Sequence, residues 1–164
     1  MTDIRLRLVE PQESALIFSF LTLAARMKES GEPIQKALVD EQLTKYWLGW
    51  GRPADLGVVA VRSLDALPLS CAWLRQLPEG DEGYVATGVL ELAFGTIESE
   101  RGRGVGSQTL MALLERARSV ALGVSLSVRA ENPAVRLYQR LGFRTTSQIV
   151  NRVGGQSLTM QLDF

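Results

Sequence analysis

Apolar residues in the first third of the chain are spaced first like a strand and then like two helices. Segment 4–8 alternates apolar and polar residues, which predicts a strand. A longer apolar stretch then predicts a helix over about 11–27, with a proline suited to its first turn. After a break at Gly31, apolar and aromatic residues return at helical spacing and predict a second helix over about 34–48.

Further along, the pattern changes to short apolar runs separated by glycine, proline and aspartate. Three such runs predict strands of a meander over 56–61, 69–74 and 89–96. A long amphipathic helix follows, with leucine and alanine on one face and Gly123 at its end. The alternating run 124–128 predicts another strand. A strand, a helix and a strand in this order imply a right-handed crossover with parallel pairing.

The last quarter of the chain predicts a short helix and two closing strands. Asn132 can cap free amides with its side chain, and Pro133 fits the first helical position. This helix is predicted to end at Gly142. The runs 143–150 and 157–164 are then predicted to be strands around a glycine turn.

These elements together predict one α/β domain over residues 1–164, with a mixed, mostly antiparallel sheet of about seven strands and about four helices. The length of 164 residues and the 46% share of hydrophobic residues suit one domain with one core. The apolar stretch 15–25 falls well short of the ~20 residues that span a bilayer, so we expect no membrane partner.

Charge and cysteine content exclude several classes of partner. Lys plus Arg and Asp plus Glu both number 18, which gives a net charge of zero without a long basic run. Nucleic acid is therefore not expected as a partner. Cys71 is the only cysteine and histidine is absent, so we expect no internal disulfide and no metal site. A reducing, cytoplasmic location is expected for such a chain.

A glycine-rich turn stands between the strand that ends at Thr96 and the long helix. It consists of Arg101, Gly102, Arg103, Gly104, Val105 and Gly106, followed by Ser107. Glycines here allow positive φ and close approach of a ligand to the main chain, while the helix N-terminus adds free amides and fractional positive charge. The turn is a candidate phosphate site, although a tight connection without a ligand also fits it.

Two common nucleotide motifs do not match this turn. The dinucleotide fingerprint needs a third glycine where Ser107 stands, and the P-loop needs a Gly-Lys-Ser/Thr sequence that is absent. The pattern Arg101-x-x-Gly104-x-Gly106 instead resembles the pyrophosphate motif of the GNAT superfamily of acetyl-CoA-dependent N-acetyltransferases.

A second segment, 132–143, resembles the second signature of the same superfamily and stands at a typical distance from the first. The resemblance is specific between residues 91 and 143, and it implies an acetyl-CoA-binding core over about 89–143. The function that it implies is transfer of an acetyl group from acetyl-CoA to a primary amine of a small molecule or protein. The first half of the chain carries no signature that identifies the amine.

The resemblance also implies which residues hold the coenzyme. The main chain of Phe94, Gly95 and Thr96 would pair with the pantetheine arm of acetyl-CoA. The amides of residues 101–107 would hold its pyrophosphate. Asn132 would contact the far side of the coenzyme arm, and this role can coexist with capping the helix.

Tyr138 matches the tyrosine with which the family often protonates the departing coenzyme A thiolate. A hydroxyl near a thiolate leaving group can share a proton with it. The same residue also reads as a core tyrosine beside an apolar helix stripe. Cys71 shares a strand face with Leu69 and Trp73 and has no histidine to activate it, which favours direct attack of the amine over transfer through a thiol.

Glu91 is the candidate base. An ammonium group near the lysine pKa of ~10.4 must lose a proton before it attacks. Glu91 alternates with Leu90 and Leu92, so it faces the opposite side of the strand, where a lone carboxylate is costly unless solvated or used. The alternative interpretation of Glu91 is a solvated surface glutamate. The alternatives for the base are a water, a tyrosine, or one of the loop acids Asp81 and Glu82.

Two other classes of function fit parts of the sequence. One is a non-catalytic module that binds or senses acyl-CoA, and the other is an interaction domain that presents tryptophans. The tryptophan spacing favours core or pocket lining over an exposed patch. Candidates for lining the acceptor pocket are Trp47, Trp50, Arg52, Trp73 and Arg75. An exposed late strand could support a homodimer.

Overall fold

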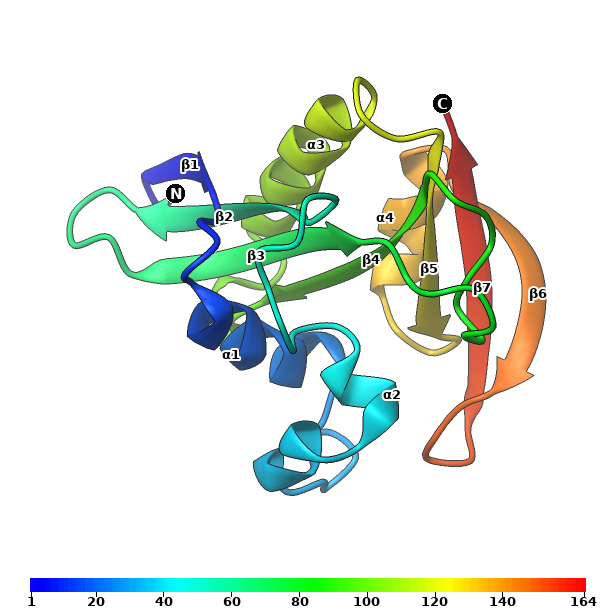
Figure 1. Cartoon of the computed structure of the whole chain (residues 1–164). Coiled ribbons are helices and arrows are strands. Elements are labelled where there is room, and N and C mark those ends of the chain that lie inside the picture. The colour runs from blue at the N-terminus through cyan, green and yellow to red at the C-terminus, as the bar shows by residue number, and fades with distance from the viewer.

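Seven strands form one sheet in the computed structural model, which describes residues 1–164 (Figure 1). The strands are β1 (Ile4–Leu8), β2 (Leu56–Arg62), β3 (Pro68–Arg75), β4 (Val89–Thr96), β5 (Gly123–Arg129), β6 (Arg144–Val150) and β7 (Gln156–Asp163). Their order in the sheet is β1-β2-β3-β4-β5-β7-β6. Only β4 and β5 pair in parallel, and the other neighbours are antiparallel. The predicted mixed, mostly antiparallel sheet and its parallel crossover are confirmed.

Four α-helices cover the two faces of this sheet. They are α1 (Ser14–Ala24), α2 (Glu41–Thr44), α3 (Val105–Ala117) and α4 (Ala134–Arg140). Helix α1 packs on β4 and β3, whereas α3 packs on β3 and β2 from the opposite face (Figure 1). Two helices are shorter than predicted. Helix α1 begins after Pro11, and α3 ends well before Gly123. No helix combines the length and apolar content needed to cross a membrane.

The predicted continuous helix over 34–48 is wrong. The structure has a 3-10 helix η1 (Ile34–Leu38) and the short α2 in its place, and a second 3-10 helix η2 (Glu98–Glu100) precedes the glycine-rich turn. Asp40 separates η1 from α2 in an extended conformation, and its carboxylate accepts a hydrogen bond from the Gln42 amide at 2.9 Å. An aspartate in this position starts a new helix because it satisfies a free amide.

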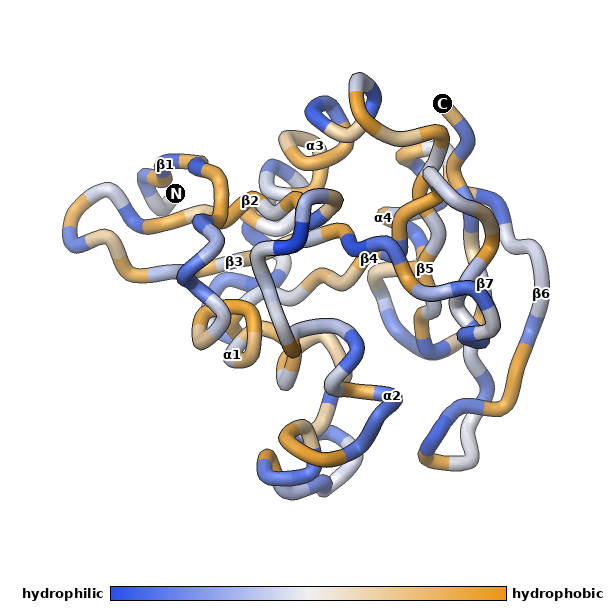
Figure 2. The backbone as a smooth tube through the Cα atoms, viewed as in Figure 1, coloured by the Kyte–Doolittle hydropathy of each residue, from blue (hydrophilic) through white to orange (hydrophobic).

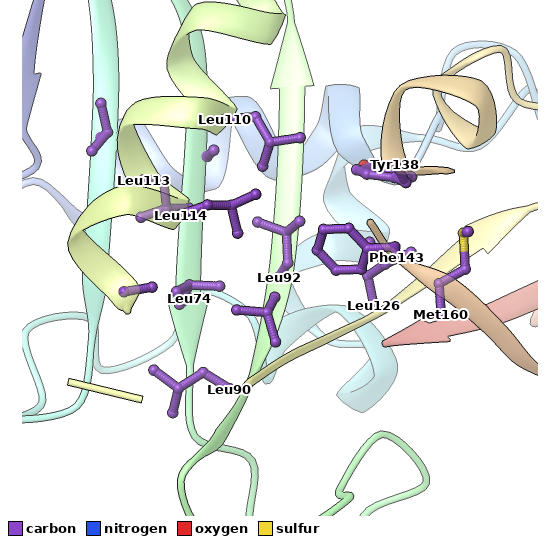
Figure 3. Close-up of a cluster of buried hydrophobic side chains, with 14 of the residues drawn as sticks. Leu74, Leu90, Leu92, Leu110, Leu113, Leu114, Leu126, Tyr138, Phe143 and Met160 are labelled. Carbon is purple, nitrogen blue, oxygen red and sulfur yellow. The ribbon is translucent and has the colours of Figure 1, made fainter. Parts of the chain in front are cut away.

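Each face of the sheet buries its own hydrophobic cluster, since side chains alternate along the strands. On the α3 and α4 face, Leu92 and Leu126 of the strands meet Leu110 of α3 and Phe143 (Figure 3). On the α1 face, a second cluster surrounds Trp73. Figure 2 shows hydrophobic stretches in α1 and the central strands, whereas β6 at the edge is polar or neutral along most of its length. All seven β6 residues are exposed.

A buried arginine ties β3 to the segment around α2. Arg75 is 1% exposed, and its Nε and Nη2 donate to the two oxygens of Asp55 at 3.0 and 2.8 Å. Its Nη1 donates to the carbonyl oxygens of Lys45 and Leu48 at 3.2 and 2.7 Å. Every side of this guanidinium is therefore satisfied within the chain.

The Asp55→Ala variant is expected to unfold more easily by about 3–5 kcal/mol, because it leaves the Arg75 charge buried without its carboxylate. Urea denaturation of both proteins measures this loss. The control is Asp65→Ala, which removes an exposed partner of Arg62 and should change stability little. A loss for Asp55→Ala no larger than that of the control would contradict the assignment.

Candidate active site

A gap in the sheet between β4 and β5 forms the centre of the site. The two strands pair only from Val89 to Glu91 on β4 and from Gly123 to Ser125 on β5. Beyond these residues β4 stays with β3, and β5 stays with β7, so the two strands diverge (Figure 1). A cavity of about 840 Å³ occupies this gap and is lined by the free parts of both strands.

The glycine-rich turn borders the cavity at the N-terminus of α3. Gly102 and Gly104 have φ of 74° and 84°, and a β-carbon on either would point into open space. Gly106 is required for packing, because a β-carbon there would lie 2.8 Å from the side chains of Phe94 and Thr96. The first two glycines thus permit the turn, and the third brings α3 against β4.

Free amides collect at this turn. The amides without an acceptor in the chain are those of Gly102, Gly104, Val105, Gly106 and Ser107. The first intrahelical bond of α3 runs from Gln108 to the carbonyl oxygen of Gly104 at 3.1 Å. Unpaired amides at a helix N-terminus, together with the helix dipole, favour a bound anion such as a phosphate.

Most of the predicted coenzyme-binding residues line the cavity. These are Phe94, Gly95, Thr96, Arg101, Gly102, Gly104, Gly106, Ser107 and Asn132. Arg103 and Val105 do not line it, and the Val105 side chain is buried in a small cluster with Leu69. Val105 therefore offers a ligand only its free amide, whereas the Arg103 amide donates to the Glu100 carbonyl oxygen at 3.4 Å.

Two of the lining residues also have partners within the protein. Arg101 donates to Glu29 at 3.3 Å and to the carbonyl oxygen of Thr96 at 3.3 Å. The side-chain oxygen of Asn132 accepts a hydrogen bond from the Ala134 amide at 2.9 Å. The capping role predicted for Asn132 is thus confirmed, and its side-chain nitrogen remains free for the cavity.

Glu91 is a buried carboxylate on the wall of the cavity. Tyr46 of the segment after α2 donates its hydroxyl to Oε1 at 3.0 Å, and Ser125 of β5 donates to Oε2 at 3.1 Å. Burial raises the pKa of Glu91 to about 7, against the lowering effect of the Tyr46 hydrogen bond and of Lys45. The alternative of a solvated surface glutamate is wrong, because only 4% of the residue is exposed.

Tyr138 of α4 faces the cavity from the opposite side of the sheet. Its ring packs edge-on against Phe94, with the centroids 6.3 Å apart, and against Phe143, with the centroids 5.7 Å apart. Figure 3 shows Tyr138 and Phe143 beside each other. The Tyr138 hydroxyl forms no hydrogen bond within the chain, but the oxygen is not fully buried. Because Tyr138 lines the cavity, the hydroxyl reaches the cavity. Burial raises the pKa of Tyr138 above its usual value, which keeps the hydroxyl protonated at neutral pH.

The predicted aromatic pocket for the acceptor is wrong. None of Trp47, Trp50, Arg52, Trp73 and Arg75 lines the cavity. The indole N–H groups of the three tryptophans donate to main-chain carbonyl oxygens of Ala37, Glu10 and Tyr46. These side chains fix the segment around α2 against the sheet instead.

Tyr46 and Ser125 were not predicted to belong to the site. The contact between Tyr46 and Glu91 joins residues 45 positions apart, and no local pattern indicates it. Ser125 could have been inferred, since it alternates with core residues of β5 and therefore shares a face with Glu91 across the parallel pair. The structure places no group of three or more cysteine, aspartate or glutamate side chains where they could hold a metal.

The fold is similar to those of several solved acetyltransferases. A GCN5-related N-acetyltransferase from Kribbella flavida superposes with a TM-score of 0.72 at 23% identity, covering 98% of each chain. YncA from Salmonella typhimurium, solved with its cofactor acetyl-CoA, gives a TM-score of 0.66 at 18% identity and covers 98% of this chain and 93% of that one. The aminoglycoside acetyltransferase AAC(6′)-Ib in complex with coenzyme A gives 0.63 at 17%, covering 98% and 95%.

Identities this low establish likeness of fold, and a comparison with curated proteins finds no match. The sequence itself matches the model of the Acetyltransferase (GNAT) family over residues 21–143, which is more than half of the chain. The matched region includes both strands of the gap, the amide-rich turn and Tyr138. The chain therefore belongs to the GNAT acetyltransferase family.

Proposed function

We propose that this protein transfers an acetyl group from acetyl-CoA directly to a primary amine. The observation that carries the proposal is one cavity that joins the free amides of the glycine-rich turn to Glu91 and Tyr138 through the gap between β4 and β5. The family and the coenzymes of the two related structures support the choice of acetyl-CoA.

The two halves of the cavity lie on opposite faces of the sheet. Phe94, Thr96 and Tyr138 belong to the face covered by α3 and α4, where the free amides are. Glu91 belongs to the α1 face with Ser125. We assign the first half to the coenzyme and the second half to the amine, so that the thioester would lie in the gap between them.

In this arrangement Glu91 would accept the proton that the ammonium group must lose. Its two oxygens each accept one hydrogen bond from the protein, which leaves lone pairs free toward the cavity. A pKa of about 7 matches a base that works near neutral pH. The carbon–nitrogen bond forms as the amine attacks the thioester carbon.

Tyr138 would complete the reaction on the other face of the sheet. As the carbon–sulfur bond breaks, its hydroxyl gives a proton to the sulfur, so that coenzyme A leaves as a thiol. Cys71 takes no part, because it is fully buried away from the cavity and burial raises the pKa of its thiol. The amine therefore needs no covalent intermediate on the protein.

The test is an amine panel incubated with the protein and acetyl-CoA. It should include lysine peptides, peptides with free N-termini, polyamines and aminoglycosides. Release of coenzyme A thiol, matched by an equal amount of N-acetylated product in mass spectrometry, is the expected result. Binding of acetyl-CoA without acetylation of any amine would instead support a non-catalytic acyl-CoA module.

The Tyr138→Phe variant is expected to lower kcat by about 10- to 100-fold, since solvent partly replaces a general acid worth ~10²–10⁴-fold. The ring contacts with Phe94 and Phe143 are kept, so affinity for acetyl-CoA should stay unchanged in calorimetry. Steady-state and single-turnover rates on both proteins measure the loss. Full activity of the variant, with chemistry rate-limiting, would return Tyr138 to a packing role.

A further inference from the structure

We propose that the amine half of the cavity accepts a zwitterion, whose amine lies at Glu91 and whose anionic group binds Arg26, Arg129 and Arg152. This inference rests on the proposed function, because it assumes that Glu91 marks the reacting end. It names the acceptor as a primary amine that carries a carboxylate or similar anion at a set distance.

The three arginines and Glu91 lie on one face of the sheet. On β5, Val124, Leu126 and Val128 fill the core on the α3 and α4 face, so Ser125 and Arg129 face the other side. Glu91 accepts a hydrogen bond from Ser125. Arg129 follows Ser125 by four residues, which is about 13 Å along an extended strand. All three arginines line the same cavity as Glu91.

Cations outnumber anions at the arginine end. Arg129 and Arg152 both donate to the carbonyl oxygen of Ala25, at 2.9 and 3.1 Å, and both lie against one carboxylate, Glu32. Glu32 is also paired with Lys36 at 3.2 Å. The other nearby acids do not remove the excess. The charge of Arg26 helps to lower the pKa of Glu29, but the Glu29 carboxylate pairs with Arg101, and Glu131 is exposed and forms no ion pair.

The arginines at this end are partly desolvated and repel one another, and both effects act on the pKa of Arg129. Burial, and then the charge of Arg152, lower the pKa of Arg129. An anion placed among the guanidinium groups would remove this repulsion and accept charge-assisted hydrogen bonds.

Arg26 provides the most direct evidence that a ligand binds at this end. Arg26 is half-buried and lines the cavity, and its side chain forms no hydrogen bond or ion pair in the chain. The backbone of Arg26 has φ of +51°, just after the end of α1. The amide of the next residue, Met27, donates to the Thr22 carbonyl oxygen at 3.2 Å. In helices that end in this way, the residue with positive φ is normally glycine. An arginine in this strained position, with no hydrogen bond or ion pair of its own, is explained by binding something that enters the cavity.

The opposite end of this half is suited to an ammonium group. Glu91 and Glu82 both line it, and Glu82 has no ion pair or hydrogen bond from its side chain. The one lysine there, Lys45, is held by Asp81 at 2.8 Å. Carboxylates at one end and guanidinium groups at the other select a molecule with both charges, about 10 Å apart after allowance for the side chains.

The test compares three probes that differ in charge and length: 8-aminooctanoate, its amide 8-aminooctanamide, and the shorter 3-aminopropanoate. Each is titrated by calorimetry into protein saturated with coenzyme A, so that no reaction is needed. We expect 8-aminooctanoate to bind about 10- to 100-fold more tightly than the other two, as for a charge-assisted hydrogen bond to a carboxylate. Equal binding of the acid and its amide would overturn the proposal.

Arg26→Gly separates a ligand role from a structural one. Glycine relieves the positive φ, so the melting temperature should stay the same or rise by a few °C, while 8-aminooctanoate should bind about tenfold more weakly. Binding of 8-aminooctanamide should not change. Arg116→Gln, on the exposed side of α3, is the matched control and should leave all three affinities unchanged.

Two further outcomes would overturn the proposal. Unchanged acid binding in Arg26→Gly would remove Arg26 from the site. Weaker binding of coenzyme A in this variant, with acid binding kept, would assign the arginines to a coenzyme phosphate. A wild-type protein that binds no coenzyme A would contradict the proposed function alone, since the probes can still be titrated into the protein by itself.

Discussion

Gly104→Glu should weaken acetyl-CoA binding at least about 100-fold, because a carboxylate would stand among the free amides assigned to the pyrophosphate. A β-carbon at Gly104 meets no atom within 4 Å, so the chain should still fold. The positive φ costs about 1–2 kcal/mol of stability with any side chain. Calorimetry with acetyl-CoA measures the affinity, and thermal unfolding measures the stability.

Gly80→Glu is the matched control for this variant. Gly80 also has positive φ, at 95°, and open space around its β-carbon position, but it does not line the cavity. It should lose a similar amount of stability and keep its affinity for acetyl-CoA. Equal affinities of the folded Gly104→Glu and Gly80→Glu proteins would contradict the assignment of the turn to the pyrophosphate.

The second large effect is expected for Glu91→Gln, which keeps the size of the side chain and removes its charge. Near neutral pH its kcat/KM should fall by about 10²–10⁴-fold, the usual contribution of a general base. The wild-type profile should rise through a pH of about 7 as Glu91 ionises. The variant lacks this step, and its deficit should shrink at higher pH as free amine accumulates near its pKa of ~10.4.

The measurement is kcat/KM against pH for both proteins, with an acceptor from the amine panel, and acetyl-CoA affinity should be unchanged. Glu82→Gln serves as the comparison, because Glu82 is the other carboxylate on this wall that forms no ion pair, and this variant should keep the step near pH 7. Superimposable wild-type and Glu91→Gln profiles would eliminate Glu91 as the base. Loss of the step in Glu82→Gln alone would transfer the role to Glu82.

Stability gives an independent check on the same carboxyl group. The pKa of Glu91 is raised in the folded state, so its contribution to stability is present below the usual value of 4.5 and is lost as pH rises through about 7. This loss is on the order of 3 kcal/mol. The free energy of unfolding of Glu91→Gln should therefore fall less between these two pH values than that of the wild type.

Strand positions could be predicted from the sequence because alternation and turn residues are local. The four strands from 56 to 128 and the last pair lie within one residue of their predicted limits. The helix predicted over 34–48 failed because Asp40 caps a new helix inside an unbroken apolar period. Periodicity reports which side of a segment is buried, and it does not report a competing hydrogen bond.

The candidate site was predictable in part, for the same reason. Glycine spacing indicated the turn, and alternation placed Glu91 on the correct face of β4. The tryptophans were rightly expected to be shielded, but spacing cannot tell whether a buried ring faces a cavity or the core. Partners distant in the sequence, such as Tyr46 for Glu91 and Asp55 for Arg75, are fixed only by packing.

The divergence of β4 and β5 also bears on the order of events in turnover. If coenzyme and amine occupy opposite faces of the sheet, as proposed, neither molecule lies in the other's route to the gap. Each can then enter an empty protein or one that already holds its partner. The two products likewise need not leave in a fixed order, because coenzyme A would leave on the α3 and α4 face and the acetylated amine on the α1 face.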